Sequence, residues 1–458
     1  MEKKNMGRRG HCLVLAYPAQ GHINPVLQFS KLLERQGMRI TLVTTRFFCN
    51  KLQTVPPSIA LETISDGFDK GGPREAGNYK LYLERFWEVG PLTFAELLEK
   101  LGRSRDEHVD CVVYDSFFPW VVDVAKRFGI VAAAYLTQNM TVNSIYYHVH
   151  LGNLQAPLTQ DQISLPALPK LHLQDMPSFF FDQDFTFLDF VVSQFSSIHK
   201  ADWILCNTFY ELDKEIADWI VKVWPNFKTT GPNIPSFFLD KQYEDDQDYG
   251  ITQFKSEECM EWLDDKPKGS VVYVSFGSMA SLGEEQMEEI AFCLRECSSY
   301  FLWVVRDSEE TKLPKDFEKK TEKGLVVTWC SQLKVLAHEA VGCFVTHCGW
   351  NSTLETLSLG VPTVAIPYWS DQNTNAKLIS DVWKTGIRAL VDEKKVVQRE
   401  TLKHCIKEIM EGCEEMKTNA IQWRNLAVRA LREGGSSYEN VKEFANKVYE
   451  IHKLHVLN

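Results

Sequence analysis

A short segment of the chain combines a tight turn with side chains that suit a phosphate ligand. It spans residues 346–355 and reads THCGWNSTLE. An apolar stretch ends at His347, Gly349 lets the backbone turn, and the pattern predicts a helix that starts near Ser352. The free N–H groups and the positive dipole end of such a helix attract an anion. Asn351 and Ser352 can add donors for one phosphate and His347 for a second, so the segment is a candidate diphosphate site.

The same residues also allow a purely structural interpretation. Ser352 and Glu355 have the spacing of a capping box, in which their side chains satisfy the backbone N–H groups of their own helix. His347 and Trp350 are equally compatible with packing in a core. The choice between the two interpretations depends on residues further along the chain.

Residues on either side of this segment favour the ligand-binding interpretation. Trp329 follows a predicted strand, where its indole can stack on a flat base, and Gln332 lies in the short turn after it. Asp371 and Gln372 follow another strand, and a carboxylate beside an amide can hold two neighbouring hydroxyls of a sugar. Glu355 can accept hydrogen bonds from the two hydroxyls of a ribose. Together these residues indicate a site for a nucleoside diphosphate that carries a sugar.

A histidine and an aspartate in the first half of the chain have positions that suit proton transfer. His22 follows the first predicted strand, and Asn24 and Pro25 after it suit the N-cap and first position of a helix. We therefore expect His22 on a strand-to-helix loop, where it can act as a general base near neutral pH. Asp115 ends another predicted strand at the same edge of the sheet and can hold the imidazole in one tautomer. The alternatives are a surface or packed histidine and an aspartate that stabilises a turn.

Short apolar runs alternate with amphipathic stretches in both halves of the chain. In the first half the predicted strands are 12–17, 39–45, 110–115, 131–137 and 203–207, and the predicted helices are 25–36, 79–101 and 119–128. In the second half the predicted strands are 270–275, 301–305, 325–328, 343–346 and 363–366, and the predicted helices are 284–297, 352–359, 371–385 and 399–411. This alternation predicts an α/β fold of two facing, Rossmann-like, doubly wound parallel sheets, with the site in the cleft between them.

The length of 458 residues also favours two domains. An acidic stretch between Pro235 and Gly250 interrupts the alternation and suggests a linker. We expect an N-terminal domain at 1–240, a linker at 241–252 and a C-terminal domain at 253–437. A last helix at 438–458 is expected to pack back on the first domain.

Composition argues against several classes of protein. The net charge of −11 disfavours nucleic acid as the main partner. No apolar run approaches the roughly 20 residues of a membrane span, and the first apolar run is too short for a signal-peptide core. The 12 cysteines form no CxxC pair and no pattern of metal ligands, which favours a reducing compartment. We expect a monomeric cytoplasmic protein that does not span a membrane.

The segment Trp329–Gln372 resembles the signature box of the plant family-1 UDP-glycosyltransferases. It has the 44 residues of that box, and Ser331 and Ser370 are small departures where many members carry proline and alanine. The resemblance extends diffusely over the whole chain and implies a GT-B-type fold. The parts that match the box are 329–332 (WCSQ), 335–338 (VLAH), 347–355, 360–362 (GVP) and 371–372.

The resemblance implies a donor-binding role for each of these positions. The residues implied for uracil and ribose are Trp329, Cys330, Gln332 and Glu355. The residues implied for the diphosphate are Ser278, His347, Gly349, Asn351 and Ser352. The residues implied for the sugar are Thr137, Trp350, Asp371 and Gln372. A glutamine at the last position is the family's usual signal for glucose, so UDP-glucose is the expected co-substrate, with no separate cofactor and no metal.

By the same resemblance, His22 is the base and Asp115 its partner in a single displacement that inverts the anomeric carbon. The first domain then binds the acceptor and the second binds the UDP-sugar. The acceptor is a small lipophilic molecule, and a terpenoid alcohol, a phenol and a carboxylic acid all remain open. Aromatic residues that could line its pocket, or equally belong to the core, are Tyr79, Phe117, Phe118, Tyr146 and 179–181.

Two other functions are consistent with parts of the sequence. A nicotinamide-dependent oxidoreductase would carry GxGxxG after an early strand, but here that strand leads to residues 19–22, which read AQGH. A non-catalytic UDP-sugar sensor would keep the 329–372 box and lose the pair formed by His22 and Asp115. Both members of the pair are present.

Overall fold

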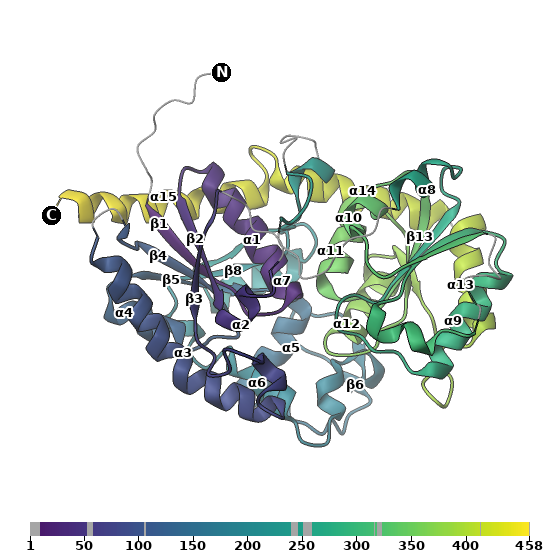
Figure 1. Ribbon diagram of the computed structural model, residues 1–458, viewed down its shortest axis with the longest axis horizontal. Coiled ribbons are helices and arrows are strands. Elements are labelled where there is room, and N and C mark those ends of the chain that lie inside the picture. Colours follow the sequence, from purple (N-terminus) through teal and green to yellow (C-terminus); the bar gives the residue numbers. More distant parts are fainter. Residues whose placement is uncertain are drawn as a thin grey trace.

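Two parallel β-sheets lie next to each other along the long axis of the molecule (Figure 1). The computed structural model describes residues 10–52, 58–104, 107–239, 246–250, 259–315, 317, 323–412 and 414–457. The predicted α/β class with two Rossmann-like sheets is therefore confirmed. Of the linker predicted at 241–252, only residues 246–250 lie within the described part of the chain.

The first sheet has seven strands in the order β3-β2-β1-β4-β5-β8-β9, and every neighbouring pair is parallel. Leu13 and Leu15 of β1 pack in the core under one face, while Cys12 and Val14 pack in the core under the other. Burial on both faces explains why β1 is continuously apolar from Cys12 to Leu15. The strands are β1 (His11–Leu15), β2 (Arg39–Thr45), β3 (Ala60–Ile64), β4 (Cys111–Asp115), β5 (Val131–Leu136), β8 (Trp203–Cys206) and β9 (Phe227–Thr229).

The second sheet has six parallel strands in the order β12-β11-β10-β13-β14-β15. Its strands are β10 (Val271–Ser275), β11 (Tyr300–Val304), β12 (Gly324–Val327), β13 (Val341–Thr346), β14 (Thr363–Ala365) and β15 (Gly386–Arg388). A separate two-stranded antiparallel pair is formed by β6 (Gln162–Ile163) and β7 (Leu171–His172).

Helices cover the faces of both sheets. Those of the first half are α1 (Gln20–Arg35), α2 (Arg46–Cys49), α3 (Tyr79–Gly102), α4 (Val121–Arg127), α5 (Met140–His150), α6 (Thr186–Ser193) and α7 (Lys214–Val223). Those of the second half are α8 (Met260–Asp264), α9 (Glu284–Glu296), α10 (Gln332–Leu336), α11 (Trp350–Leu359), α12 (Gln372–Lys377), α13 (Arg399–Lys407), α14 (Glu414–Leu431) and α15 (Ser436–Leu457). No helix in the described part of the chain combines the length and apolar character needed to span a bilayer.

Each sheet reverses its strand order at one point. In the first sheet the reversal lies between β1 and β4, and in the second it lies between β10 and β13. Chains that leave such neighbouring strands in opposite directions open a crevice at the carboxyl ends of the strands, where α/β proteins bind ligands. His22 and Asp115 follow or end the two strands at the first reversal, and Ser278 and His347 follow the two strands at the second.

Helix α1 begins five residues earlier than the predicted start at Pro25. Its N-cap is Ala19, so His22 lies in the first turn of the helix rather than on a loop. Pro25 stands inside the helix and has no N–H to donate to the carbonyl of Gly21. The carbonyl of Gly21 instead accepts a hydrogen bond of 2.7 Å from the Asn351 side chain of the other half of the molecule. An outside donor therefore replaces the bond that the proline removes.

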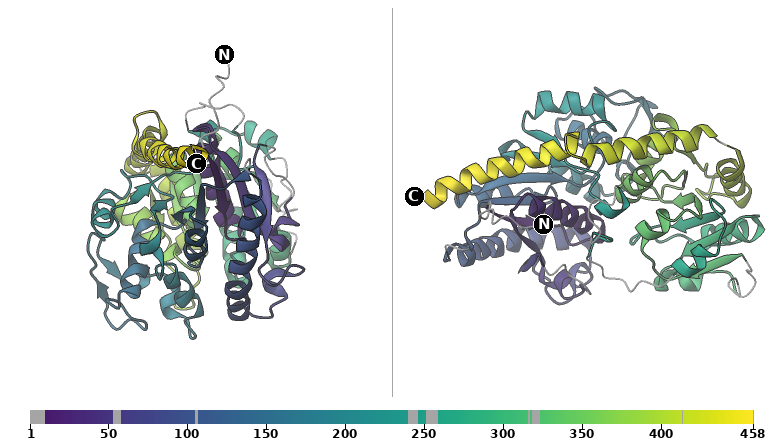
Figure 2. Two further views of the ribbon diagram at one scale, coloured as in Figure 1. Left: turned by 90° about the vertical axis from the view of Figure 1, so that its left-hand side faces the viewer. Right: turned by 90° about the horizontal axis from the view of Figure 1, so that it is seen from above.

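The last helix returns along the first domain. Helix α14 packs against α11, and α15 continues from it across the molecule to the N-terminal sheet (Figure 2). Val441, Phe444 and Val448 of α15 are fully or almost fully buried in the core that contains α1. The ring centroid of Phe444 lies 5.6 Å from that of Trp203 on β8, and Lys228 of β9 forms a 2.8 Å ion pair with Glu443.

Candidate active site

A cleft of about 800 Å³ separates the carboxyl ends of the two sheets. Its walls come from both halves of the chain. Of the residues singled out from the sequence, those that line it are His22, Thr137, Ser278, Trp329, Cys330, Gln332, His347, Gly349, Trp350, Asn351, Ser352, Glu355, Asp371 and Gln372. Asp115 does not line the cleft, because it is fully buried behind His22. The structure thus brings together residues that are up to 350 positions apart in the sequence, counted from His22 to Gln372.

The imidazole of His22 is held by a buried carboxylate. Its Nδ1 atom lies 2.6 Å from Oδ2 of Asp115 and 3.2 Å from Oγ1 of Thr137. The other carboxylate oxygen accepts the backbone N–H of Phe117 at 3.0 Å, which fixes the orientation of Asp115. Both hydrogen bonds of the ring involve Nδ1, so Nε2 is the nitrogen left to accept a proton from a molecule in the cleft.

His347 lies between two glycines at the reversal point of the second sheet. A Cβ atom on Gly277 would lie 2.8 Å from its ring, and a Cβ atom on Gly349 would lie 2.6 Å from its Nε2 atom. Gly277 also has a φ of +72°, which few other residues adopt. Burial, and then the positive charge of Arg306, lower the pKa of His347 to about 4. The ring is therefore neutral near pH 7 and can donate one N–H without carrying a charge.

The N-terminus of α11 opens toward the same part of the cleft. Its N-cap is Gly349, which has no side chain. The first backbone N–H groups of the helix therefore receive no capping bond from the N-cap residue. A capping box would require Ser352 to be the N-cap residue that precedes the helix. The helix begins at Trp350, so Ser352 already lies inside it and the capping box with Glu355 does not form. Ser352 instead accepts a hydrogen bond of 2.8 Å from Gln332.

Glu355 is the centre of a polar cluster one turn into α11. Gln332 donates to one of its oxygens at 2.6 Å, and the hydroxyl of Tyr249 donates to the other at 2.8 Å. Burial raises the pKa of Glu355 to about 7, although both hydrogen bonds act in the opposite direction. Its charge is therefore sensitive to pH in the neutral range.

Asp371 and Gln372 stand side by side where α12 begins. The amide oxygen of Gln372 accepts the backbone N–H groups of Tyr368 and Trp369 at 2.9 and 2.8 Å, which turns its NH₂ group away from them. Asp371 accepts a 2.7 Å hydrogen bond from Asn375, and burial raises its pKa to about 6. An amide donor and a carboxylate acceptor are thus presented together to the cleft.

Trp350 and Asn351 connect the two domains. The indole N–H of Trp350 donates to the carbonyl of Asn207 at 2.8 Å, and its ring is 4% exposed against Trp383. The Asn351 amide donates to Gly21, as described above. Both residues border the cleft, and both also fix α11 relative to the first domain.

The sequence interpretation did not include Arg306 and Tyr249. Arg306 donates to the carbonyl of Ser278 at 2.5 Å and also to the carbonyl of Ala280, so it holds the loop after β10 in place. It follows β11 by two residues, and a charged residue at a strand's carboxyl end is the signal that could have identified it. Tyr249 lies in the segment that the sequence analysis assigned to the linker, and nothing in that segment predicts a contact between Tyr249 and Glu355.

The part of the cleft next to His22 is aromatic. Tyr79, Phe117 and Phe179 line it, as the sequence suggested, whereas Phe118, Tyr146 and Phe180 are buried in the core and Phe181 is exposed. Further aromatic residues of this wall are Tyr17, Phe187, Phe190 and Trp369. Among the residues that the structure describes, no lysine or arginine lines the cleft.

Comparisons with known proteins identify relatives of this chain. Residues 236–427 match the family model described as UDP-glucoronosyl and UDP-glucosyl transferase. A mogroside I-E synthase of Siraitia grosvenorii is 46% identical over 95% of this chain and 97% of its own length. A flavonol 7-O-beta-glucosyltransferase of Arabidopsis thaliana is 46% identical over 96% of this chain and 98% of its own. The crystal structure of Os79 from O. sativa in complex with UDP has a TM-score of 0.90 and 38% identity, and covers 95% of this chain and 100% of that chain.

Similarity of this extent defines both the class and the family. The fold and the relatives are those of enzymes that use a UDP-sugar as donor. The chain belongs to the plant family-1 UDP-glycosyltransferases, as the signature box suggested. Enzymatic UDP-glycosyltransferase activity toward small-molecule acceptors follows from this membership.

Proposed function

We propose that the enzyme transfers glucose from UDP-glucose to a hydroxyl group of a small, neutral, lipophilic acceptor, with inversion at the anomeric carbon. The observation that carries this proposal is the 2.6 Å contact between His22 and buried Asp115 at the aromatic end of the cleft. A non-catalytic UDP-sugar sensor would have no use for a base in that place. The domains then divide the work: residues 1–240 bind the acceptor, and residues 253–437 bind the donor.

The reaction is a single displacement. The acceptor O–H gives its proton to Nε2 of His22 while its oxygen attacks the anomeric carbon from the face opposite UDP. The new C–O bond forms as the bond from that carbon to the diphosphate oxygen breaks, which yields a β-glucoside and UDP. Asp115 stabilises the positive charge that develops on the ring. The N-terminus of α11 and the N–H of His347 stabilise the negative charge on the departing diphosphate.

In this proposal each group along the cleft binds one part of the donor. For uracil and ribose the residues are Trp329, Cys330, Gln332 and Glu355. For the diphosphate they are Ser278, His347, Gly349, Asn351 and Ser352. For glucose they are Thr137, Trp350, Asp371 and Gln372. The indole N–H of Trp350 and one of the two amide N–H groups of Asn351 are used in contacts between the domains. Trp350 therefore contributes to donor binding only through its ring, and Asn351 through its second N–H and its amide oxygen.

The lining of the acceptor side favours a neutral acceptor over a carboxylate. An ionised acid placed in the aromatic pocket would lose its hydration without meeting a cation, since no described lysine or arginine lines the cleft. A carboxylate is also already deprotonated at pH 7 and gains little from His22. A flat phenol or a fused-ring alcohol fits the aromatic walls and needs the base. The names of the mogroside and flavonol enzymes among the relatives are consistent with acceptors of this kind.

An acceptor competition tests this proposal. With UDP-glucose as donor, an equimolar mixture of a flavonol, a triterpenoid alcohol and a benzoate is expected to give glucosides of the neutral compounds, identified by mass, and little or no glucose ester. The anomeric coupling in the proton NMR spectrum of the product is expected to show the β configuration. Preferential formation of a glucose ester would contradict the claim that a pocket without lysine or arginine disfavours a carboxylate acceptor. If no product forms with any acceptor, a non-catalytic UDP-sugar sensor becomes the better interpretation.

The pKa of Glu355 makes UDP affinity depend on pH. Because burial raises this pKa to about 7, the ionised form that accepts hydrogen bonds from both ribose hydroxyls dominates above pH 7 and is lost below it. The affinity for UDP is therefore expected to fall as the pH is lowered from 8 to 6, approaching a tenfold loss per pH unit well below the pKa, about as linkage requires. Isothermal titration calorimetry at several pH values measures this change.

Glu355→Gln is the control for this experiment. The variant retains the shape of the side chain and cannot titrate, so its UDP affinity should be lower at pH 8 and should vary with pH only through the phosphate of UDP itself. Parallel pH profiles of the two proteins would show that Glu355 does not bind the ribose as a carboxylate.

A further inference from the structure

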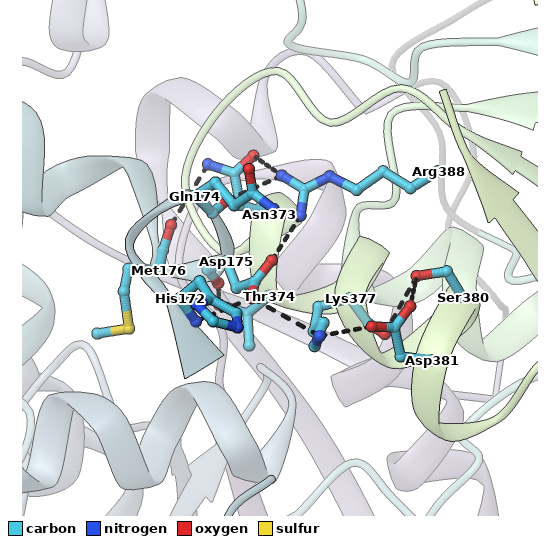
Figure 3. A network of polar contacts seen from close by, with 10 residues as sticks. All are labelled: His172, Gln174, Asp175, Met176, Asn373, Thr374, Lys377, Ser380, Asp381 and Arg388. Atoms are coloured by element: carbon cyan, nitrogen blue, oxygen red, sulfur yellow. Dashed lines mark hydrogen bonds and ion pairs between the residues drawn. The ribbon is translucent and has the colours of Figure 1, made fainter. Parts of the chain in front are cut away.

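A polar network joins the two domains beside the cleft (Figure 3). Its centre is Asp175, the last residue of a short 3₁₀ turn, η3 (Leu173–Asp175), in the first domain. One oxygen of its carboxylate accepts a 2.8 Å hydrogen bond from Arg388 at the end of β15. The other accepts the backbone N–H of His172 at 2.9 Å and lies 3.9 Å from the ammonium group of Lys377. The side chain of Asp175 is only 2% exposed, so this carboxylate is buried between two cations of the other domain.

The backbone around Asp175 is bound to the second domain as well. The hydroxyl of Thr374 on α12 donates to the carbonyl of Asp175 at 2.7 Å. Arg388 also donates to the carbonyl of Gln174 at 2.8 Å, and Asn373 donates to the carbonyl of Met176 at 3.3 Å. Three consecutive carbonyls of the first domain thus accept hydrogen bonds from side chains of α12 and β15.

Two more hydrogen bonds join the domains at Ser370, directly before Asp371 and Gln372 in the chain. The backbone N–H of Ser178 donates to the carbonyl of Ser370 at 2.9 Å, and the N–H of Ser370 donates to the hydroxyl of Ser178 at 2.8 Å. Ser370 has a φ of +61°, a conformation that a non-glycine residue adopts only when its surroundings hold it there. Asp371 and Gln372 are therefore enclosed between the contacts of Ser370 and those of Thr374 and Lys377.

Helix α12 depends on such outside support. It has six residues, its N-cap Asp371 makes no side-chain capping bond, and it continues directly into a π-helical turn, Leu378–Val382. A helix of this length is not stable by itself. The direction in which Asp371 and Gln372 point therefore depends on what α12 is attached to, and the network around Asp175 is its attachment to the first domain.

The same segment of the first domain also forms a wall of the acceptor pocket. It continues into a second short turn, η4 (Ser178–Phe181), in which the ring of Phe179 meets Trp369 edge to face, with centroids 5.1 Å apart. Trp369 is one of the two residues whose N–H groups orient Gln372. The segment 172–179 thus touches both the acceptor wall and the loop that reads the sugar.

We propose that Asp175 is a positioning residue for the sugar half of the donor. It holds α12 directly through Lys377 and Thr374, and indirectly through Arg388 of β15, which also donates to the side-chain oxygen of Asn373 on α12 at 3.3 Å. Asp371 and Gln372 therefore meet the glucose hydroxyls only when the two domains are docked. This inference rests on the proposed role of Asp371 and Gln372 as the sugar-binding pair. The residues proposed for the nucleotide half of the donor lie on α11, on α10 and on the loops after β10, β12 and β13. Asp175 makes no contact with these parts among the contacts described.

Asp175→Asn tests the proposal because it keeps the shape of the side chain and removes its charge. The KM for UDP-glucose is expected to rise and kcat to fall, together by on the order of tenfold to a hundredfold, the usual cost of a misplaced binding group. The dissociation constant for UDP is expected to stay within about twofold, because UDP lacks the sugar. The preference for UDP-glucose over UDP-galactose is expected to weaken, since the pair that reads the sugar is less firmly held.

The matched control is Glu289→Gln. It removes a largely buried carboxylate that binds Arg399 at 2.5 and 3.0 Å within the second domain, on the α9–α13 side away from the cleft. This variant is expected to lose thermal stability as Asp175→Asn does, and to keep the KM for UDP-glucose and the donor preference. If both variants change the donor parameters alike, or if Asp175→Asn weakens UDP and UDP-glucose equally, Asp175 has only a structural role and the proposal is overturned.

Two further variants keep the outcome decisive. Arg388→Lys keeps the positive charge but loses the guanidinium group that binds Asp175 and Gln174 at the same time. This variant is expected to raise the KM for UDP-glucose and to leave the dissociation constant for UDP unchanged. It provides the test if Asp175→Asn fails to fold. Gln372→His separates this proposal from the assigned sugar site. A changed donor profile for Gln372→His with unchanged profiles for both Asp175→Asn and Arg388→Lys overturns the positioning role alone. An unchanged profile for Gln372→His overturns the sugar site and, with it, the inference.

Discussion

Replacing His22 with alanine is expected to lower kcat/KM for a phenol or a terpenoid alcohol by about 10²- to 10⁴-fold, the usual contribution of a general base. The affinity for UDP is expected to persist, because His22 comes from α1 and the groups proposed to hold UDP come from the second domain. Steady-state rates with a flavonol, together with calorimetric titration of UDP, measure the two effects separately.

Asp115→Asn and a second histidine–aspartate pair sharpen this test. Asp115→Asn alone is expected to lose much of the same activity, and the double variant little more, because the two residues act as one unit. His452 of α15 and buried Asp110 of the first domain form a similar pair, with Nδ1 and Oδ2 3.0 Å apart, and neither residue lines the cleft. His452→Ala should leave transfer unaffected. Full activity of His22→Ala on a hydroxyl acceptor would show that another group takes the proton.

Replacing Gly349 with alanine is expected to weaken UDP binding by about 10- to 100-fold, the equivalent of one hydrogen bond to a charged group. The new Cβ atom would lie 2.6 Å from Nε2 of His347, a separation that real atoms do not tolerate. The ring therefore has to move away from the place where its N–H is proposed to meet the diphosphate. Calorimetric titration of UDP measures the loss.

Gly283→Ala is a closely matched control for this substitution. Gly283 is also a glycine at the N-cap of a helix, α9, with an extended backbone like that of Gly349. A Cβ atom there would meet nothing within 4 Å. The two variants therefore lose the same conformational freedom, and only Gly349→Ala displaces His347. Equal UDP affinities in the two variants would mean that His347 is not a ligand of the diphosphate.

The sequence predicted those parts of the fold that rest on long apolar runs. Strands β2 and β10 fall within one residue of their predicted ends. The sequence missed three edge strands of the two parallel sheets, and it also missed the short antiparallel pair β6 and β7. Residues 60–64 are only partly buried, and β9 and β15 are three-residue strands that each contain a charged side chain, so none of them forms an apolar run. The start of α1 was misplaced because Pro25 suits the first position of a helix, and no local pattern reveals that Asn351 satisfies the Gly21 carbonyl.

In the site, too, the sequence predicted residues that belong to one local segment and missed residues that act through distant partners. The donor box could be recognised because its residues lie within one contiguous segment. Tyr249, Arg306 and Asp175 act through partners 106, 28 and 213 positions away, and all three lie outside the segment 329–372. Asn351 and Trp350 looked like donor ligands, yet their N–H groups bond backbone carbonyls of the first domain. Only the packing of one domain against the other assigns these contacts.

The hydrogen bond from Asn351 to Gly21 has a consequence for turnover. When the domains separate, water can replace the Asn351 amide at the carbonyl that Pro25 leaves without a partner, so opening exchanges one hydrogen bond for another. The net cost of breaking this bond is therefore only about 0.5–1.5 kcal/mol. This contact therefore adds little to the cost of opening the cleft beyond that of the other contacts between the domains, which suits an enzyme that has to release UDP and a glycosylated product after every cycle.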